Sequence, residues 1–225
     1  MQPLLDEAQS ALAAGDLGRA HRALCGLAPP LPAAVTLLLA ELEIAHGTDA
    51  ALAAAVERLE GLSETADPDQ GERAWGWVLL GAARACQGDD LAARPHFEQG
   101  LAHDPEWAAG EYGAGFVGTL IELEDFVAAD EALAVVEATA PEGIAARTMR
   151  ARWLRRQDRP GEALAVLQLE HGPADDAGLA FEAACAFHAL GQATRAQAWA
   201  RRARRVQPTW FARALRFEPP HLRPE

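Results

Sequence analysis

Residues 74–107 read AWGWVLLGAARACQGDDLAARPHFEQGLAHDPEW, and the spacing within them guides the interpretation of the whole chain. Two runs rich in alanine and leucine flank an acidic turn formed by Gly88, Asp89 and Asp90. A glycine can end one helix, and an aspartate can cap the next. The stretch therefore predicts two short antiparallel helices, with bulky side chains between them and small residues where the backbones approach closely.

The same pattern recurs along the chain with a period of about 34 residues. Within residues 74–107, the positions that define it are Trp77, Leu80, Gly81, Ala93, Phe97 and Pro105. A Trp-x2-Leu-Gly start, an Ala-x3-Phe middle and a closing proline are the spacing of the tetratricopeptide repeat (TPR), so the chain resembles TPR proteins over nearly its whole length. Copies are expected at about 1–34, 35–70, 74–107, 108–143, 144–176 and 177–208, with a capping helix and a loose tail at 209–225.

The resemblance implies an all-α fold, a right-handed α-solenoid of about six helical hairpins closed by a C-terminal capping helix. In this family the first helices of the hairpins line a concave groove that receives a peptide. The resemblance therefore implies a non-catalytic scaffold or adaptor that binds a segment of a partner protein. The best-known groove of the family is a clamp of Lys, Asn and Arg for a chaperone's C-terminal carboxylate. This sequence contains neither lysine nor asparagine and cannot build that clamp.

The composition favours helices and excludes several kinds of chemistry. Of the 225 residues, 50% are hydrophobic but only 6% are aromatic, and β-branched residues are few. The absence of lysine excludes a phosphate-binding Walker loop and Schiff-base chemistry. No basic leader and no apolar run of about 18 residues is present, so we expect a cytoplasmic protein without membrane insertion. The cysteines, Cys25, Cys86 and Cys185, form neither a CxxC motif nor a Cys/His cluster and indicate a reducing compartment.

Charge is divided unevenly along the chain, which has a net charge of −13. Residues 1–146 carry −19 and residues 147–225 carry +6. In the fifth copy, the repeat offsets place Arg152, Arg155 and Arg156 on the groove side. Forked guanidinium groups suit carboxylates, so these residues predict a protein or peptide partner with acidic groups. A solvated face, or pairing with acids of a neighbouring repeat, remains open as the alternative.

Three aromatic residues are candidates for the apolar walls of the groove. By the same offsets, Trp75 belongs to the third copy, and Tyr112 and Phe116 belong to the fourth. Residues at such positions more often belong to the core or to incidental surface than to a contact. Aromatic anchors dominate the energetics of many interfaces, so Trp75 and Tyr112 are the favoured contacts among the three.

A second group of arginines lies in the last copy and suggests two other functions. Its members are Arg195, Arg201, Arg202, Arg204 and Arg205. Two features argue against nucleic-acid binding through them: the chain is acidic overall, and the repeat offsets place them on the outer surface. Alternatively, the acidic and basic halves of two copies could associate into a homo-oligomer.

The sequence predicts no enzyme, no cofactor and no metal site. Gly113–Gly118 spells GxGxxG, but dinucleotide binding needs a preceding β-strand, and none is expected here. Neither an HExxH metal motif nor a GxSxG nucleophile motif is present. Cys185 and His188 lie three residues apart on one expected helix, where a buried cysteine beside a partly exposed histidine is the favoured interpretation.

Overall fold

The chain is described here by a computed structural model. It describes residues 4, 7–8, 10–11, 16–27, 30–62, 69–140, 143–169 and 176–215. Within these ranges every regular element is helical, so the predicted all-α fold is confirmed. Contacts divide the chain into two compact units, Met1–Trp107 and Ala108–Glu225. The expected loose tail beyond residue 215 lies outside the described residues.

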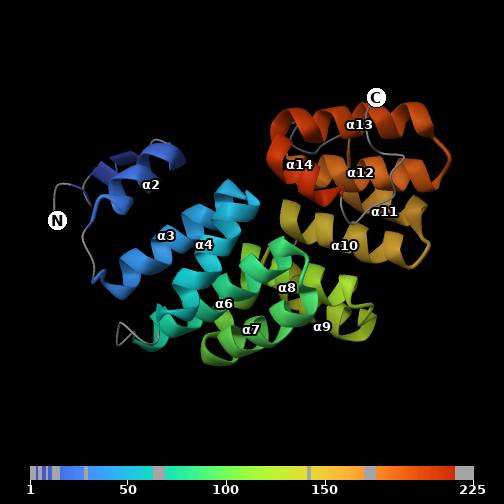
Figure 1. Cartoon of the computed structure of the whole chain (residues 1–225). Coiled ribbons are helices and arrows are strands. Elements are labelled where there is room, and N and C mark those ends of the chain that lie inside the picture. Colours follow the sequence, from blue (N-terminus) through green and yellow to red (C-terminus); the bar gives the residue numbers. More distant parts are fainter. Residues whose placement is uncertain are drawn as a thin grey trace. The chain divides into compact units, whose positions relative to one another are not determined.

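The first unit contains hairpins of antiparallel helices that pack against one another (Figure 1). Its described helices are α2 (Leu17–Cys25), α3 (Ala33–His46), α4 (Asp49–Glu60), α6 (Gln70–Gln87) and α7 (Asp90–His103). Helix α3 pairs with α4, and α6 pairs with α7. Helix α6 also contacts both helices of the preceding hairpin, so the hairpins stack side to side. The short 3-10 helix η1 (Pro105–Ala109) follows α7.

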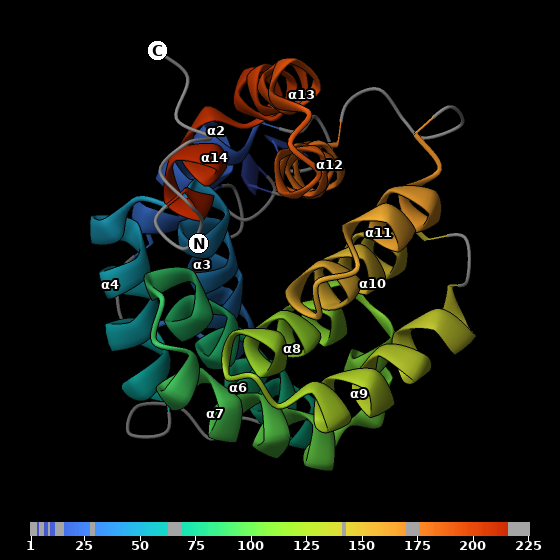
Figure 2. The same ribbon diagram turned by 90° about the vertical axis from the view of Figure 1, so that its right-hand side faces the viewer.

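The second unit repeats the same arrangement and ends with one additional helix. Its helices are α8 (Glu111–Glu122), α9 (Phe126–Thr139), α10 (Ile144–Arg156), α11 (Pro160–Leu167), α12 (Ala177–Ala189), α13 (Ala193–Val206) and α14 (Pro208–Ala214). Helix α10 lies beside its hairpin partner α11 (Figure 2). It also contacts α8 and α12, the first helices of the hairpins before and after it. These three first helices carry the candidate site described below.

The turns inside the hairpins share one backbone conformation. Gly88 ends α6 with a φ of 84°, and the side chain of Asp89 accepts a hydrogen bond from the backbone N–H of Ala92 at 3.1 Å. In the second unit Glu124 occupies the equivalent position with a φ of 59°, followed by the capping residue Asp125. The left-handed residue reverses the chain, and the aspartate satisfies a donor at the start of the next helix. The acidic turns therefore end one helix and cap the next, as the sequence predicted.

The small residues of the repeat lie where helices meet. A Cβ added to Gly81 on α6 would lie 2.8 Å from the ring of Phe97 on α7. Phe97 itself is 1% exposed, so the ring has no solvent-filled space into which to retreat. Ala93, Ala129 and Ala163 are likewise fully buried. The predicted close approach of the paired helices is confirmed at these positions.

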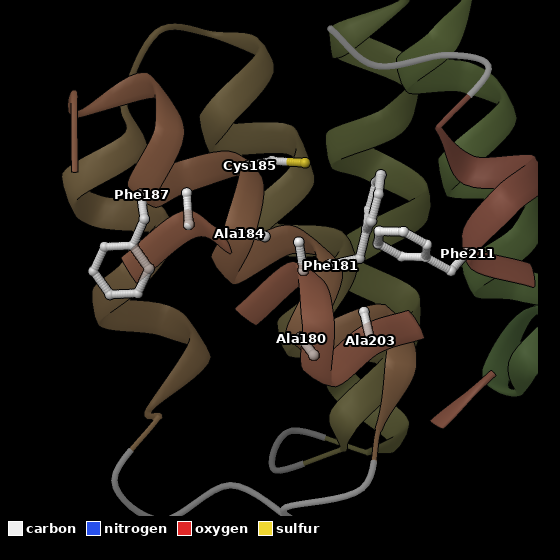
Figure 3. Packing of buried hydrophobic residues seen from close by; sticks show 9 residues of the cluster. Ala180, Phe181, Ala184, Cys185, Phe187, Ala203 and Phe211 are labelled. Atoms are coloured by element: carbon white, nitrogen blue, oxygen red, sulfur yellow. The ribbon is translucent and has the colours of Figure 1, made fainter. Parts of the chain in front are cut away.

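Helix α14 covers the apolar side of the last hairpin. Figure 3 shows the labelled rings of Phe181 and Phe211 beside one another in this cluster. Their centroids are 5.9 Å apart in an edge-to-face arrangement, and Phe211 is only 2% exposed. The ring of Trp210 meets Phe181 in the same way at 5.5 Å. The predicted capping helix is therefore present.

The GxGxxG sequence lies within helix α8 and has no dinucleotide-binding geometry. The element before it is η1 and not a β-strand. A Cβ at Gly113 would collide with the backbone carbonyl of Ala108. The absence of a side chain at Gly113 thus allows the start of α8 to lie close to the backbone of Ala108.

Replacing Gly81 with valine should destabilise the fold because the new side chain would collide with Phe97. We expect Gly81→Val to lower the free energy of unfolding by about 2 kcal/mol, measured by chemical denaturation. Gly161→Ala is the matched control, because nothing lies within 4 Å of a Cβ at this position in the first turn of α11. Equal stability of the two variants would contradict the packing described here.

Candidate functional site

Helix α10 is rich in arginine, and its guanidinium groups contact acceptors on the neighbouring helices. Five arginines lie on the helix and Arg159 follows it. The acceptors are Leu167 and Gln168 for Arg147, Asp130 and Glu137 for Arg150, Glu182 for Arg152 and Arg155, Glu122 for Arg156, and Glu162 for Arg159. Most of these contacts reach to another helix. The guanidinium groups of α10 therefore bind mainly to acceptors of the second unit itself.

The most buried of these contacts is formed by two arginines and one carboxylate. Nε of Arg152 donates to Oε1 of Glu182 at 2.7 Å, and Nε of Arg155 donates to Oε2 at 3.1 Å. The side chain of Glu182 is 1% exposed, against 19% for Arg152 and 9% for Arg155. We call these three residues the α10–α12 triad, because it joins those two helices.

The two guanidinium groups keep Glu182 ionised. Burial alone raises the pKa of this carboxyl group, but the positive charges of Arg155 and Arg152 and their hydrogen bonds outweigh that effect and lower the pKa below its usual value. Burial likewise lowers the pKa of Arg152, and the charges of Glu182 and Glu122 more than compensate. The triad therefore carries two positive charges and one negative charge.

A second ion pair connects α10 to α8. Nη2 of Arg156 donates to Oε2 of Glu122 at 2.6 Å, and both side chains are partly exposed. On the same side of α8, Nη1 of Arg152 lies 3.5 Å from the position that a Cβ of Gly118 would occupy. The ion pairs of α8, α10 and α12 thus form one connected surface, which we call the first-helix face of the second unit. Among the described residues, this face brings together Arg152, Arg155 and Arg156 with Glu122 and Glu182.

Two of the predicted aromatic residues lie on α8. Tyr112 and Phe116 are both half-buried, one turn apart. Phe116 packs against the apolar cluster that includes Val117 and Leu120. Phe116 therefore contributes to the core and also retains some exposed surface.

The third predicted aromatic residue, Trp75, belongs to the first unit. It is half-buried on α6, and its ring stacks on Trp107 with centroids 6.3 Å apart and an interplanar angle of 12°. Its indole N–H is buried and has no hydrogen-bond partner among the described residues. Trp75 lies in the first unit and the other five candidates lie in the second, so they form two separate groups.

Sequence reasoning found the arginines but not their partners. Pairing with acids of neighbouring repeats was left open, and the structure shows such pairs for Arg152, Arg155 and Arg156. Glu182 carried a usable signal, because it is the only acidic residue in the otherwise apolar helix AGLAFEAACAFHA. A single acid in a buried helix beside an arginine-rich helix predicts a buried ion pair.

The arginines of α13 differ from those of α10. Helix α13 contains no acidic residue, and Arg201, Arg204 and Arg205 are exposed. The structure shows no ion pair for these three among the described residues. The guanidinium of Arg202 instead lies over the ring of Trp199, 4.7 Å from its centroid, and covers that aromatic surface.

The sequence pattern did not single out Cys25, which the structure places beside a histidine. Its Sγ lies 3.6 Å from Nε2 of His21, four residues earlier on α2. Cys185 is 4% exposed and belongs to the core cluster beneath α14, as the favoured interpretation expected. No group of three side chains suited to a metal ion occurs within the described ranges.

Comparison with solved structures identifies the fold, whereas no family model and no curated protein matches the sequence. A tetratricopeptide repeat protein from Parabacteroides merdae aligns with a TM-score of 0.62 and 15% identity, covering 96% of this chain and 84% of that chain. This chain has the tetratricopeptide-repeat fold. The TPR2AB-domain:pHSP90 complex of yeast Sti1 aligns with a TM-score of 0.38 and 15% identity, over 96% of this chain and 95% of that chain.

The resemblance inferred from the repeat spacing is therefore confirmed at the level of the fold. Identities of 15% carry no residue-level information about a binding site. In the part of the TPR array that the structure describes, no helix combines the length and the apolar character needed to cross a membrane.

Neutralising Glu182 should destabilise the second unit, because it leaves two guanidinium groups without a buried counter-charge. We expect Glu182→Gln to lower the free energy of unfolding by roughly 3 kcal/mol near neutral pH. The lowered pKa of Glu182 stabilises the fold above the carboxyl's unfolded value of about 4.3, and this stabilisation is lost as the pH falls through the folded value. The difference between wild type and variant should therefore shrink in acid.

The matched control for this prediction is Glu162→Gln, which disrupts only an exposed ion pair with Arg159. Denaturation curves recorded between neutral and acid pH would test both variants. A Glu182→Gln variant as stable as the Glu162→Gln control at neutral pH would show that the triad has little structural effect.

Proposed function

We propose that this TPR protein is a non-catalytic adaptor of the cytoplasm that binds an acidic segment of a partner protein on the first-helix face of its second unit. The observation that carries the proposal is the geometry of Arg152, whose Nε holds the buried carboxylate of Glu182 while its side chain is 19% exposed. A guanidinium group has donors on two further nitrogens, so a carboxylate of the partner can bind there. The three cysteines Cys25, Cys86 and Cys185 are free thiols, which fits a reducing compartment.

Arg152 is the residue best suited to receive the partner's carboxylate. It uses Nε to hold Glu182, and no hydrogen bond of its two terminal nitrogens is seen among the described residues. Its side chain is also more exposed than that of Arg155. In this proposal Arg155 and Arg156 fix the orientation of Arg152 and add to the positive potential, since each is also tied to an acid of a neighbouring helix.

Two aromatic candidates supply apolar contacts for the same partner. Tyr112 and Phe116 lie on α8, which is also the helix that contributes Glu122 to this face. Trp75 is proposed as an aromatic contact of the first unit alone, where its stacking on Trp107 holds the ring in place. Anchors of this kind, with a positive group to set orientation, suit an extended or helical peptide.

Removing the charge of Arg152 should weaken partner binding while the buried carboxylate keeps one counter-charge. We expect Arg152→Gln to reduce affinity for the partner segment about tenfold, because a charge-assisted hydrogen bond contributes roughly 1.5–3 kcal/mol. Affinity capture from a lysate of the source organism would identify the segment. Titration of a synthetic peptide, with its acidic groups intact or converted to amides, would then measure the loss.

Arg159→Gln is the control, because Arg159 pairs with Glu162 within its own turn and is not part of the first-helix face. Denaturation of both variants shows whether the fold is retained. Equal affinities of wild type and Arg152→Gln for the acidic peptide, with the fold intact, would overturn the proposed site.

A second candidate function rests on the exposed arginines of α13. No ion pair of Arg201, Arg204 or Arg205 is seen among the described residues, which favours contact with a polyanion, either a nucleic acid or the acidic half of a second copy. Captured material that is released by nuclease, or a mass that rises with concentration at low salt, would support this candidate. The covered ring of Trp199 is an argument against binding of single strands, which stack their bases on exposed aromatic rings.

A further inference from the structure

A thiol, an imidazole and a buried carboxylate lie together in the first unit, far in sequence from the α10–α12 triad. Cys25 is the last residue of α2, and its side chain is exposed. Its Sγ lies 3.9 Å from Nδ1 and 3.6 Å from Nε2 of His21. Residues four apart on a helix occupy the same face, which explains why the two side chains meet.

The ring of His21 is held by contacts from the next hairpin. Its Nε2 lies 3.6 Å from Oε1 of Glu43 on α3, whose side chain is 6% exposed. The ring also stacks on His46, with centroids 6.2 Å apart. Arg58 on α4 donates to both oxygens of Glu43, at 2.8 and 3.2 Å, and fixes the carboxylate in turn. The imidazole is therefore positioned directly by α3, and α4 acts on it only through the contact of Arg58 with Glu43.

This arrangement allows His21 to remove the proton of the thiol. With its proton on Nδ1, the neutral imidazole keeps the lone pair of Nε2, the nitrogen nearer to Sγ, as the acceptor of the thiol proton. After proton transfer, the resulting imidazolium faces the carboxylate of Glu43, which stabilises its charge. A neighbouring base of this kind can take the thiol proton at the moment of reaction.

We propose that Cys25 is a site of reversible modification by low-molecular-weight disulfides, with His21 as the general base and Glu43 as the residue that positions it. The thiol proton moves to His21, and the sulfur electron pair of Cys25 attacks one sulfur of the disulfide. The new S–S bond forms as the old one breaks, and the leaving thiolate takes the proton from His21. Cys25 is oxidised to a mixed disulfide, and the other half of the reagent is reduced to a free thiol.

The site is independent of the proposed peptide surface, because all of its residues belong to the first unit. The charged and titratable groups that face the thiol are His21, Glu43 and Arg58, with His46 behind the imidazole ring. The other two cysteines serve as internal references. Cys86 is half-buried and Cys185 is buried.

The test is the rate at which oxidised glutathione modifies each cysteine of the full chain, followed by peptide mass mapping. Near pH 7 we expect Cys25 to react about tenfold faster in wild type than in His21→Gln, with the two rates converging at high pH where thiols ionise without help. His103→Gln, which changes an exposed histidine at the end of α7, should leave the rate unchanged. A thiol reductant should restore the unmodified chain.

The outcome that overturns the proposal is an identical rate and pH profile for wild type and His21→Gln. Reaction of Cys25 no faster than that of Cys86 would overturn it as well. If His21 served only to stabilise the fold, the substitution would lower the melting temperature without changing the pH profile of the reaction. Circular dichroism of each variant separates loss of fold from loss of the base.

Discussion

A buried carboxylate between two guanidinium groups is the interaction on which the second unit depends. Glu182 is almost inaccessible to water, so any arrangement of α10 and α12 that separates it from Arg152 and Arg155 leaves buried charges uncompensated. An apolar replacement of the whole triad could be equally stable. The triad instead makes incorrect pairing of α10 with α12 costly in free energy. In a repeat array, where neighbouring hairpins present similar apolar faces, such a constraint specifies one arrangement of helices.

The arginines of α10 and those of α13 differ in the ion pairs they form with the described residues of neighbouring helices. On α10 the arginines reach acids of α8, α9 and α12, and most of their charge stabilises contacts between helices. On α13 the arginines have no acid on their own helix and project from the exposed face. The triad joins α10 to α12, and α8, which pairs with α10 through Glu122 and Arg156, carries the half-buried Tyr112 and Phe116. This combination favours a peptide surface on the first helices of the second unit over the outer helix as the principal binding site.

Much of the fold could be predicted from the sequence because the determinants of a repeat are local. Gly81 and Phe97 are separated by 16 positions, and their contact follows from the antiparallel pairing of two adjacent helices. The cap formed by Trp210 and Phe211 followed from an apolar cluster directly after the last repeat. Ion pairs were harder to predict, because Arg152 and Glu182 are 30 residues apart and their meeting depends on the rotation of each helix.

The cluster around Cys25 shows the same limit at shorter range. Its spacing from His21 could have been read from the sequence, whereas the approach of Glu43 from another helix could not.

The most direct test of the central claim is a double-mutant cycle of Arg155→Met and Glu182→Leu in chemical denaturation. The account predicts a coupling energy of about 2 kcal/mol or more between the two residues. Additive effects, within about 0.5 kcal/mol, would contradict the dependence of the second unit on this buried carboxylate.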